Sequence, residues 1–148
     1  MSEEKVYRVP FTKTQGAVTP TKGSKEAAGH DLYSDEAYDI APHSTVKVGT
    51  GISVAIPNGT FGAIFARSGI AVKRGLRPAN CVGVVDSDYR GEVIVALHND
   101  TDEMMSIEKH ERIAQLVVIP YLPINFERVD SLNNTDRGTG GFGSTGKL

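Results

Sequence analysis

The sequence predicts a single all-β domain, arranged as a sandwich, a jelly roll or a closed barrel, with one short helix and a glycine-rich C-terminal tail. Short apolar runs recur at nearly even spacing between turn signals, which is typical of sandwiches and barrels. No long segment keeps the 3.6-residue apolar period of an amphipathic helix. With 148 residues, 39% of them hydrophobic, the chain can form one domain with a modest core.

Eight apolar runs have strand character, and turn-forming residues separate them. These runs span residues 6–9, 45–48, 52–56, 61–66, 82–85, 93–97, 113–119 and 124–129. The turn signals between them include residues 41–42, 49–51, 57–59 and 100–102. Residues 69–74 are expected to form the one helical turn. We therefore expect one β domain over residues 1–136, followed by a separate tail over residues 137–148.

The composition indicates where in the cell the protein is expected and which kinds of partner it is not expected to bind. The single cysteine, Cys81, excludes an intramolecular disulfide, and residues 1–5 lack the apolar run of a signal peptide. Sixteen basic against eighteen acidic residues give no overall field for a nucleic acid, and no apolar stretch is long enough for a membrane span. We expect a soluble, intracellular, cytoplasmic protein without nucleic-acid or membrane partners. One local basic cluster would suit a small polyanion: Arg67, Lys73, Arg74 and Arg77.

The last twelve residues cannot build a core or a regular element, because five of them are glycines. Glycine loses the most backbone entropy on ordering, so this tail should stay mobile unless a ligand or a neighbour engages it. Two glycine patterns for phosphate binding match here, but both require a helix after the glycines, and the sequence stops at Leu148. A plain flexible terminus is the alternative interpretation.

The most suggestive internal segment runs from an apolar strand into a turn. Residues 82–85 lead directly into Asp86, which places a carboxylate at a strand end beside low-dielectric surroundings. Such a group can act as a general base. Residues 88–91 then predict a tight turn that carries Tyr89 at the tip of a hairpin. An ordinary Asp-rich turn is the alternative.

Polar residues elsewhere suit phosphate or metal binding. Arg67, Ser68 and Gly69 follow an apolar strand and offer the cation, hydroxyl and close backbone approach that a phosphate oxygen needs, although solvated loops often contain such triplets. Asp31 could orient a metal-bound water, and Gln115 could contact a phosphate; structural polar roles are the alternative for both. The four histidines lack metal-ligand spacing, so a zinc site is not expected.

Together, five segments resemble the ordered motif series of the trimeric deoxyuridine triphosphate nucleotidohydrolases, the dUTPases: residues 28–32, 67–71, 83–91, 111–116 and 137–146. The match covers essentially the whole chain. The resemblance implies a jelly-roll-like β subunit, a homotrimer with active sites at the subunit junctions, and hydrolysis of dUTP to dUMP and pyrophosphate with Mg²⁺. That reaction keeps uracil out of DNA and supplies dUMP for thymidylate synthesis.

The resemblance also implies roles for individual residues. Asp86 would activate the water that attacks the α-phosphorus, Tyr89 would lie against the deoxyribose, and Asp31 would help to order the waters of the metal. The uracil edge would meet Asn80, Gly83, Val84 and Val85. The phosphate chain would meet Arg67, Ser68, Gly69 and Gln115. In the tail, which would close as a lid over a neighbouring subunit's site, the substrate-binding residues would be Arg137, Phe142 and Gly143.

Three positions depart from the motifs of the family. His110 stands where a glycine is common, Val85 replaces isoleucine, and Ile70 replaces leucine. Two alternatives remain: an enzyme like dCTP deaminase, which has a related fold, and a nucleotide-gated binding or regulatory module. Release of pyrophosphate from dUTP, without ammonia from dCTP, would separate the hydrolase from the deaminase.

Overall fold

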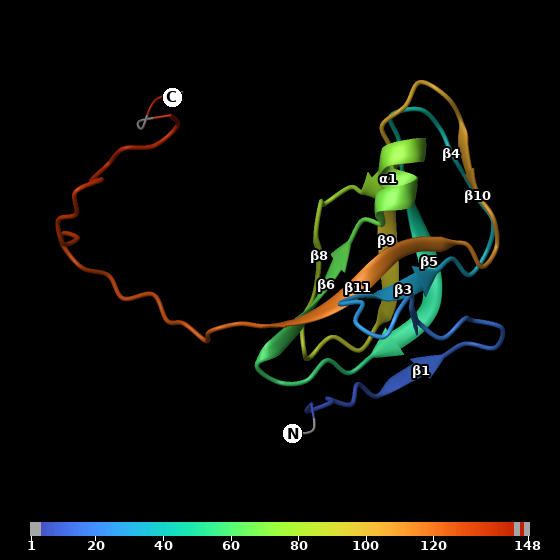
Figure 1. Cartoon of the computed structure of the whole chain (residues 1–148), viewed down its shortest axis with the longest axis horizontal. Coiled ribbons are helices and arrows are strands. Elements are labelled where there is room, and N and C mark those ends of the chain that lie inside the picture. The colour runs from blue at the N-terminus through green and yellow to red at the C-terminus, as the bar shows by residue number, and fades with distance from the viewer. Residues whose placement is uncertain (1–3, 144–145, 147–148) are drawn as a thin grey trace.

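The computed structural model describes residues 4–143 and 146, and these residues form a β-sandwich with one short helix. The four-stranded sheet has the order β1-β5-β9-β7, the five-stranded sheet has the order β2-β3-β11-β6-β8, and β10 pairs with β4 at one end (Figure 1). Every strand pairing is antiparallel. The all-β prediction is confirmed. The closed-barrel alternative is wrong, because β1, β7, β2 and β8 are open edges.

The strands of the four-stranded sheet are β1 (Phe11–Lys13), β5 (Thr45–Val54), β9 (Glu92–Asn99) and β7 (Leu76–Pro78). Those of the five-stranded sheet are β2 (Thr21–Lys22), β3 (His30–Tyr33), β11 (Arg112–Pro120), β6 (Thr60–Phe65) and β8 (Gly83–Val85). The small pair is β4 (Tyr38–Ile40) and β10 (Met105–Ile107).

The core lies between the two larger sheets. Along β9, Val93, Val95 and Leu97 are buried while Ile94 is exposed, which is the alternation of an antiparallel strand with one face against a core. The five-stranded sheet contributes Leu32 and other aliphatic side chains from its inner face. The largest fully buried apolar side chains are Leu32, Ile40, Ile52, Leu76, Leu97, Ile107 and Ile113.

The one helix, α1 (Ser68–Arg74), confirms the helical turn predicted for residues 69–74. Its side chain Ile70 is buried, and it ends at Gly75, whose φ of 65° is the left-handed conformation that favours glycine. α1 packs beside β7 at one end of the sandwich (Figure 1). Across the residues that the structure describes, no helix combines the length and the apolar character needed to cross a membrane.

Two strand predictions are wrong, and two other predicted strands are one continuous strand. Residues 6–9 form no strand, and the first strand begins at Phe11. Residues 45–48 and 52–56 do not form two strands: the single strand β5 covers most of both, because the glycine-containing segment between them shifts the register against β9 instead of ending the strand. Residues 124–129 form no strand, since no described strand lies beside them to pair with their backbone. After Pro120 the chain leaves the sandwich as an extended arm (Figure 1).

Candidate active site

Six of the predicted site residues line one pocket beside β8, which we call the hairpin pocket. Its volume is about 230 Å³. The six are Asn80, Gly83, Val84, Val85, Asp86 and Tyr89. Side chains from β6 and β9 complete the lining: Ile64, Glu92, Val93 and Ile94.

The hairpin pocket forms where an edge strand meets a turn. β8 pairs with β6 along one side only, with Gly83 opposite Ile64 and Val85 opposite Gly62. Gly83 allows this close approach, since a Cβ there would lie 3.2 Å from the Ile64 Cβ. The outer backbone edge of β8 therefore keeps N–H and C=O groups that no described strand pairs.

Asp86 follows the last residue of β8, as the sequence predicts. Its carbonyl accepts a hydrogen bond of 3.1 Å from the Tyr89 amide, which closes the turn. The expectation of low-dielectric surroundings is wrong for the single subunit, because Asp86 is exposed at the open edge of the sheet. Its carboxylate forms no hydrogen bond or ion pair with any described side chain or backbone group, so its oxygens are free to accept a proton.

A second group, which we call the Asp31 cluster, lies on the neighbouring strands β3 and β11 and on the segment that joins β6 to α1. The Arg67 Nε donates a hydrogen bond of 3.0 Å to the Asp31 Oδ1, and the Arg112 Nη1 lies 3.9 Å from the Asp31 Oδ2. The Asp31 side chain is only 14% exposed. Gln115 pairs with Asp31 across the strands, and its Nε2 donates a hydrogen bond of 3.0 Å to the Ala66 carbonyl.

A β-bulge in β11 brings this cluster together. Arg112 is opposite Tyr33 and Gln115 is opposite Asp31, with a shift of register between Arg112 and Ala114. Residues three apart in a regular strand point to opposite faces, whereas one extra residue returns them to the same face. The Arg112 guanidinium also lies 5.8 Å from the centre of the Tyr33 ring. The sequence prediction assigned no role to Arg112, because a bulge leaves no clear signal in residue spacing.

Ser68 and Gly69 begin α1 directly after Arg67, and both are exposed. Amides in the first helical turn have no partner within the helix, and here no side chain caps the N-terminus. These two residues therefore present polar backbone and a hydroxyl beside the Asp31 cluster. The structure does not join the cluster to the hairpin pocket: no hydrogen bond or ion pair between described residues links the two groups.

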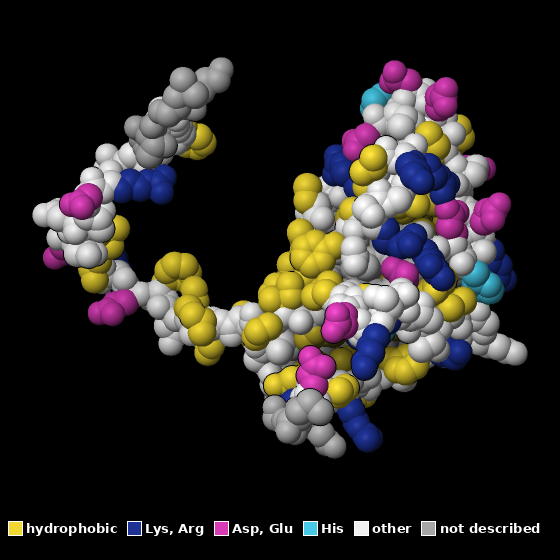
Figure 2. Space-filling view, viewed as in Figure 1, with side chains coloured by type: hydrophobic (Ala, Val, Ile, Leu, Met, Phe, Trp, Pro, Cys, Tyr) yellow, Lys and Arg dark blue, Asp and Glu magenta, His cyan; other side chains and the backbone are white. Residues whose placement is uncertain are grey.

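The predicted tail residues lie apart from both groups. Beyond Pro120 the arm extends away from the sandwich, and its apolar side chains face solvent (Figure 2). Arg137 donates from Nε to the Gly140 carbonyl at 2.8 Å, and Phe142 is fully exposed, next to Gly143. Residues 144–145 and 147–148 of the predicted lid lie outside the described residues.

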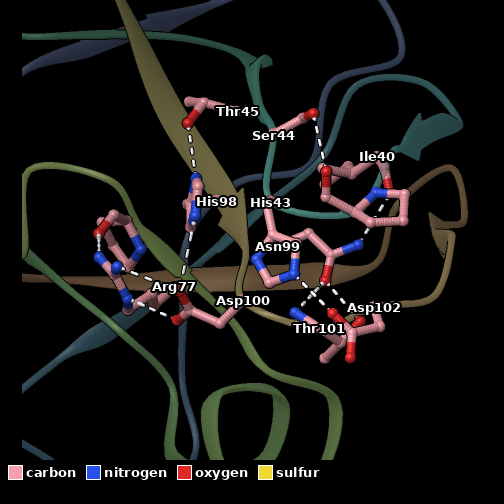
Figure 3. A network of polar contacts seen from close by, with 12 residues as sticks. Ile40, His43, Ser44, Thr45, Arg77, His98, Asn99, Asp100, Thr101 and Asp102 are labelled. Atoms are coloured by element: carbon pink, nitrogen blue, oxygen red, sulfur yellow. Dashed lines mark hydrogen bonds and ion pairs between the residues drawn. The ribbon is translucent and has the colours of Figure 1, made fainter.

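The predicted basic cluster is not a single anion site, because its arginines are paired with different acids. Arg74 binds Glu111. Arg77 donates to both carboxylate oxygens of Asp100, at 2.7 and 3.2 Å (Figure 3). These bonds raise the pKa of Arg77 and lower that of Asp100. Only Arg67 belongs to the candidate active site.

The residues present fit a hydrated Mg²⁺ better than a fully protein-bound metal. No three His, Cys, Asp or Glu side chains among the described residues converge on one point. Mg²⁺ commonly uses one or two carboxylates, keeps several waters and takes its other ligands from substrate phosphates. Asp31 matches that chemistry: a carboxylate has about four lone-pair sites, and two nearby guanidinium groups leave room for a water.

Known proteins with similar sequences and structures identify the family. The family model described as dUTPase matches residues 15–146. The deoxyuridine 5'-triphosphate nucleotidohydrolase of Candida albicans is 48% identical over 93% of this chain and 86% of the relative. The enzyme of the same name from Nautilia profundicola is 46% identical over 90% of this chain and 94% of the relative. The solved structure of Staphylococcus bacteriophage 80alpha dUTPase with dUPNHPP has a TM-score of 0.88 at 27% identity, covering 95% of this chain and 99% of that chain.

These similarities agree with the geometry of the candidate site. A β-sandwich that holds a carboxylate beside an open strand edge, and a second polar cluster nearby in the same sheet, is a scaffold for a small polar ligand. The chain belongs to the dUTPase family. The resemblance inferred from the five sequence motifs is confirmed.

Proposed function

We propose that this protein hydrolyses dUTP to dUMP and pyrophosphate, with uracil and deoxyribose in the hairpin pocket. The observation that carries the proposal is the gathering of Asp86, Tyr89 and the open edge of β8 around one cavity, in a chain of the dUTPase family. The reaction would keep uracil out of DNA and supply dUMP for thymidylate synthesis. We place it in the cytoplasm, where a reducing environment would keep the exposed thiol of Cys81 free.

The uracil would form hydrogen bonds with the outer backbone edge of β8, in the place that an additional strand would take. The outer edge of β8, from Gly83 to Val85, offers backbone donors and acceptors in fixed positions, and the Asn80 side chain lies at the same pocket. Cytosine carries an amine where uracil carries a carbonyl, which would leave site groups unpaired. Unpaired groups of this kind can discriminate by roughly 10⁴-fold or more.

Asp86 would act as the general base. A base must have free lone pairs and must lie within reach of the attacking water. Asp86 meets the first requirement, because no described group binds its carboxylate. The water would give its proton to Asp86 as its oxygen attacks the α-phosphorus, and pyrophosphate would leave on the opposite side.

The Asp31 cluster would hold the triphosphate. Arg67 uses its Nε for Asp31 and directs no other guanidinium nitrogen to a described partner, so Nη1 and Nη2 are available to phosphate oxygens. Ser68, Gly69 and Gln115 would add neutral donors. Bound Mg²⁺ would supply charge neutralisation on the phosphates, and the Asp31 carboxylate would hold one of its waters. Positioning and charge neutralisation provide most of the catalysis in phosphoryl transfer.

The tail would close the site. Arg137 carries the charge for a terminal phosphate, Phe142 carries the aromatic face for the base, and Gly143 belongs to the flexible segment that would fold over the substrate. Closure of such a lid excludes water and strengthens the electrostatic interactions inside the site. This would give Asp86 the low-dielectric surroundings that it lacks in the isolated subunit.

We propose a homotrimer, with active sites at the subunit junctions. The arm exposes apolar side chains at alternate positions: Leu122 is 84% exposed, Ile124 is 70% exposed and Phe126 is 98% exposed. Burying each such side chain contributes about 1.5–3 kcal/mol. The sandwich has a groove of about 670 Å³, with apolar lining from β1, β5 and β11, that another copy's arm could fill. Exchange of arms would also carry each tail towards a neighbouring subunit.

The test of the proposed base uses two aspartates of the same hairpin. Asp86→Asn removes the base while keeping the shape of the side chain, and we expect pyrophosphate release from dUTP to fall by about 10²- to 10⁴-fold. Asp88→Asn is the matched control, because Asp88 is also exposed but does not line the hairpin pocket. Binding of a non-hydrolysable dUTP analogue should persist in both variants. Full turnover in Asp86→Asn would remove Asp86 from the mechanism.

A further inference from the structure

The ring of Tyr89 is held in place by its own hairpin. Its hydroxyl donates a hydrogen bond of 2.8 Å to the Glu92 carbonyl, three residues along the chain. Tyr89 also lines the hairpin pocket beside Asp86. The ring is therefore anchored at its far end, while one side of it borders the space proposed for the sugar.

Gly91 supplies the space in which the far end of that ring lies. A Cβ built on Gly91 would lie 2.5 Å from the Tyr89 hydroxyl oxygen, 2.6 Å from Cζ and 3.0 Å from Cε2. Protein Cβ atoms essentially never approach other heavy atoms this closely. Gly91 does not have a left-handed φ, so the backbone itself would accept an alanine. The backbone conformation at position 91 therefore does not require glycine. The Tyr89 ring requires it, because a side chain at this position would occupy the space of the ring.

We infer that Gly91 is a positioning residue that sets the discrimination between deoxyribose and ribose by fixing the Tyr89 ring. This inference rests on the proposed function, in which uracil and deoxyribose lie in the hairpin pocket. The family resemblance implies that the Tyr89 ring then lies against the sugar and leaves no room for a 2′-hydroxyl. An added methyl group at position 91 would push the ring away from the hairpin backbone. The hydroxyl would then lose its hydrogen bond to Glu92, and the ring would no longer have one fixed position at the sugar.

The expected consequence is a change of specificity. A mobile ring leaves room for a 2′-hydroxyl in some of its positions, so UTP becomes a better substrate. The same mobility removes contacts with deoxyribose, so the KM for dUTP rises. Because Asp86 and the outer edge of β8 are untouched, kcat for dUTP should fall less than kcat/KM. A purely structural role for Gly91 would instead lower kcat for both nucleotides equally and leave their ratio unchanged.

The test compares kcat/KM for dUTP with that for UTP in the full-length protein. We expect the dUTP-to-UTP ratio to fall at least tenfold in Gly91→Ala. Gly23→Ala is the matched control, since a Cβ at Gly23 meets nothing within 4 Å and its φ is not left-handed; its ratio should equal that of the wild type. An unchanged ratio in a folded Gly91→Ala would overturn the inference.

Two further variants separate this inference from the proposed function. Tyr89→Ala should itself lower the ratio, and adding Gly91→Ala to it should change nothing more, because the residue through which Gly91 acts is gone. An unchanged ratio in Tyr89→Ala would refute the proposed sugar contact instead. If Gly91→Ala does not fold, Tyr89→Phe tests the same anchor: loss of one hydrogen bond should lower the ratio by about threefold to tenfold. A wild-type ratio in Tyr89→Phe would then overturn the inference.

Discussion

His110 provides a sharp test of the backbone reasoning, because it holds a conformation that suits glycine. Its φ is 64°, in the turn before β11, at the position where the family motif commonly has glycine. The His110 amide donates to the Ser34 carbonyl at 3.0 Å, and the buried Ser34 hydroxyl donates to the Glu108 carbonyl at 2.7 Å. The turn is thus fixed on both sides, and the residue cannot relax to a negative φ without breaking a hydrogen bond.

The magnitude follows from two opposing terms. A non-glycine residue in the left-handed region costs about 1–2 kcal/mol. Glycine has a greater backbone entropy in the unfolded chain, which costs about 0.5–1 kcal/mol on folding. The two ranges leave a net gain of about 0–1.5 kcal/mol. His110→Gly should therefore raise the free energy of unfolding by up to about 1.5 kcal/mol per subunit, which at that limit is a rise of about 3–6 °C in Tm for a domain of this size.

Urea denaturation at fixed protein concentration measures this difference, because the stability of the proposed trimer would depend on its concentration. His110→Ala is the matched control: it removes the exposed imidazole but keeps a Cβ, so the strain remains and stability should stay within about 0.5 kcal/mol of the wild type. The reasoning would be refuted if His110→Gly were less stable than the wild type. It would also be refuted if alanine stabilised the protein as much as glycine did.

Three other predictions address the phosphate site, the arm and pH. In Gly29→Ala the new Cβ would lie 2.5 Å from the Gln115 Oε1; if Gln115 holds phosphate, KM for dUTP should rise about tenfold, and an unchanged KM would exclude that role. If the chain forms the proposed trimer, Phe126→Asp should shift it towards monomers in light scattering, whereas Val72→Asp, at a side chain of α1 that is 84% exposed, should leave the trimer intact. Burial and the charge of Lys22 lower the pKa of His30 from its ordinary 6.5, against the opposing charge of Asp31. Between that lowered pKa and 6.5 the unfolded chain binds more protons, so the free energy of unfolding should fall as pH drops through this window, and less so in His30→Gln.

The strands that could be predicted from sequence are those whose own residues carry a clear pattern. β9 and β11 have eight and nine residues, enough to show their apolar positions. The missed strands β1, β2, β4, β7 and β10 have two or three residues, too few to show a period of two. Their position depends on partners far away in the sequence, such as β10 for β4. The arm shows the opposite error. Residues 124–129 have the sequence pattern of a strand, but they form none because no described strand pairs with them.

The candidate site divides in the same way. The family resemblance predicted six of the residues that line the hairpin pocket, because one short segment of chain supplies them, but it did not predict the lining residues of β6 and β9. The contact of Arg112 with Asp31 was not predictable, since it depends on a bulge that the spacing does not reveal. The space that Gly91 leaves for the Tyr89 ring was not predictable either. A glycine in a turn is usually attributed to a positive φ, and the sequence does not show which side chain needs the space.

The two aspartates of the candidate site lie in different environments, which supports different proposed roles for them. Asp31 is mostly buried and lies near two guanidinium groups: Arg67 donates a hydrogen bond to its Oδ1, and the Arg112 Nη1 lies 3.9 Å from its Oδ2. Asp86 is exposed and has no described partner, so its lone pairs are available for a proton. The Asp31 Oδ1 already accepts a hydrogen bond from Arg67, and the Asp31 side chain is only 14% exposed, so an attacking water has less access to it than to the exposed Asp86. The contacts of the two residues therefore support the proposed roles, Asp86 as the base and Asp31 as an organiser of charge, in addition to the motif to which each belongs.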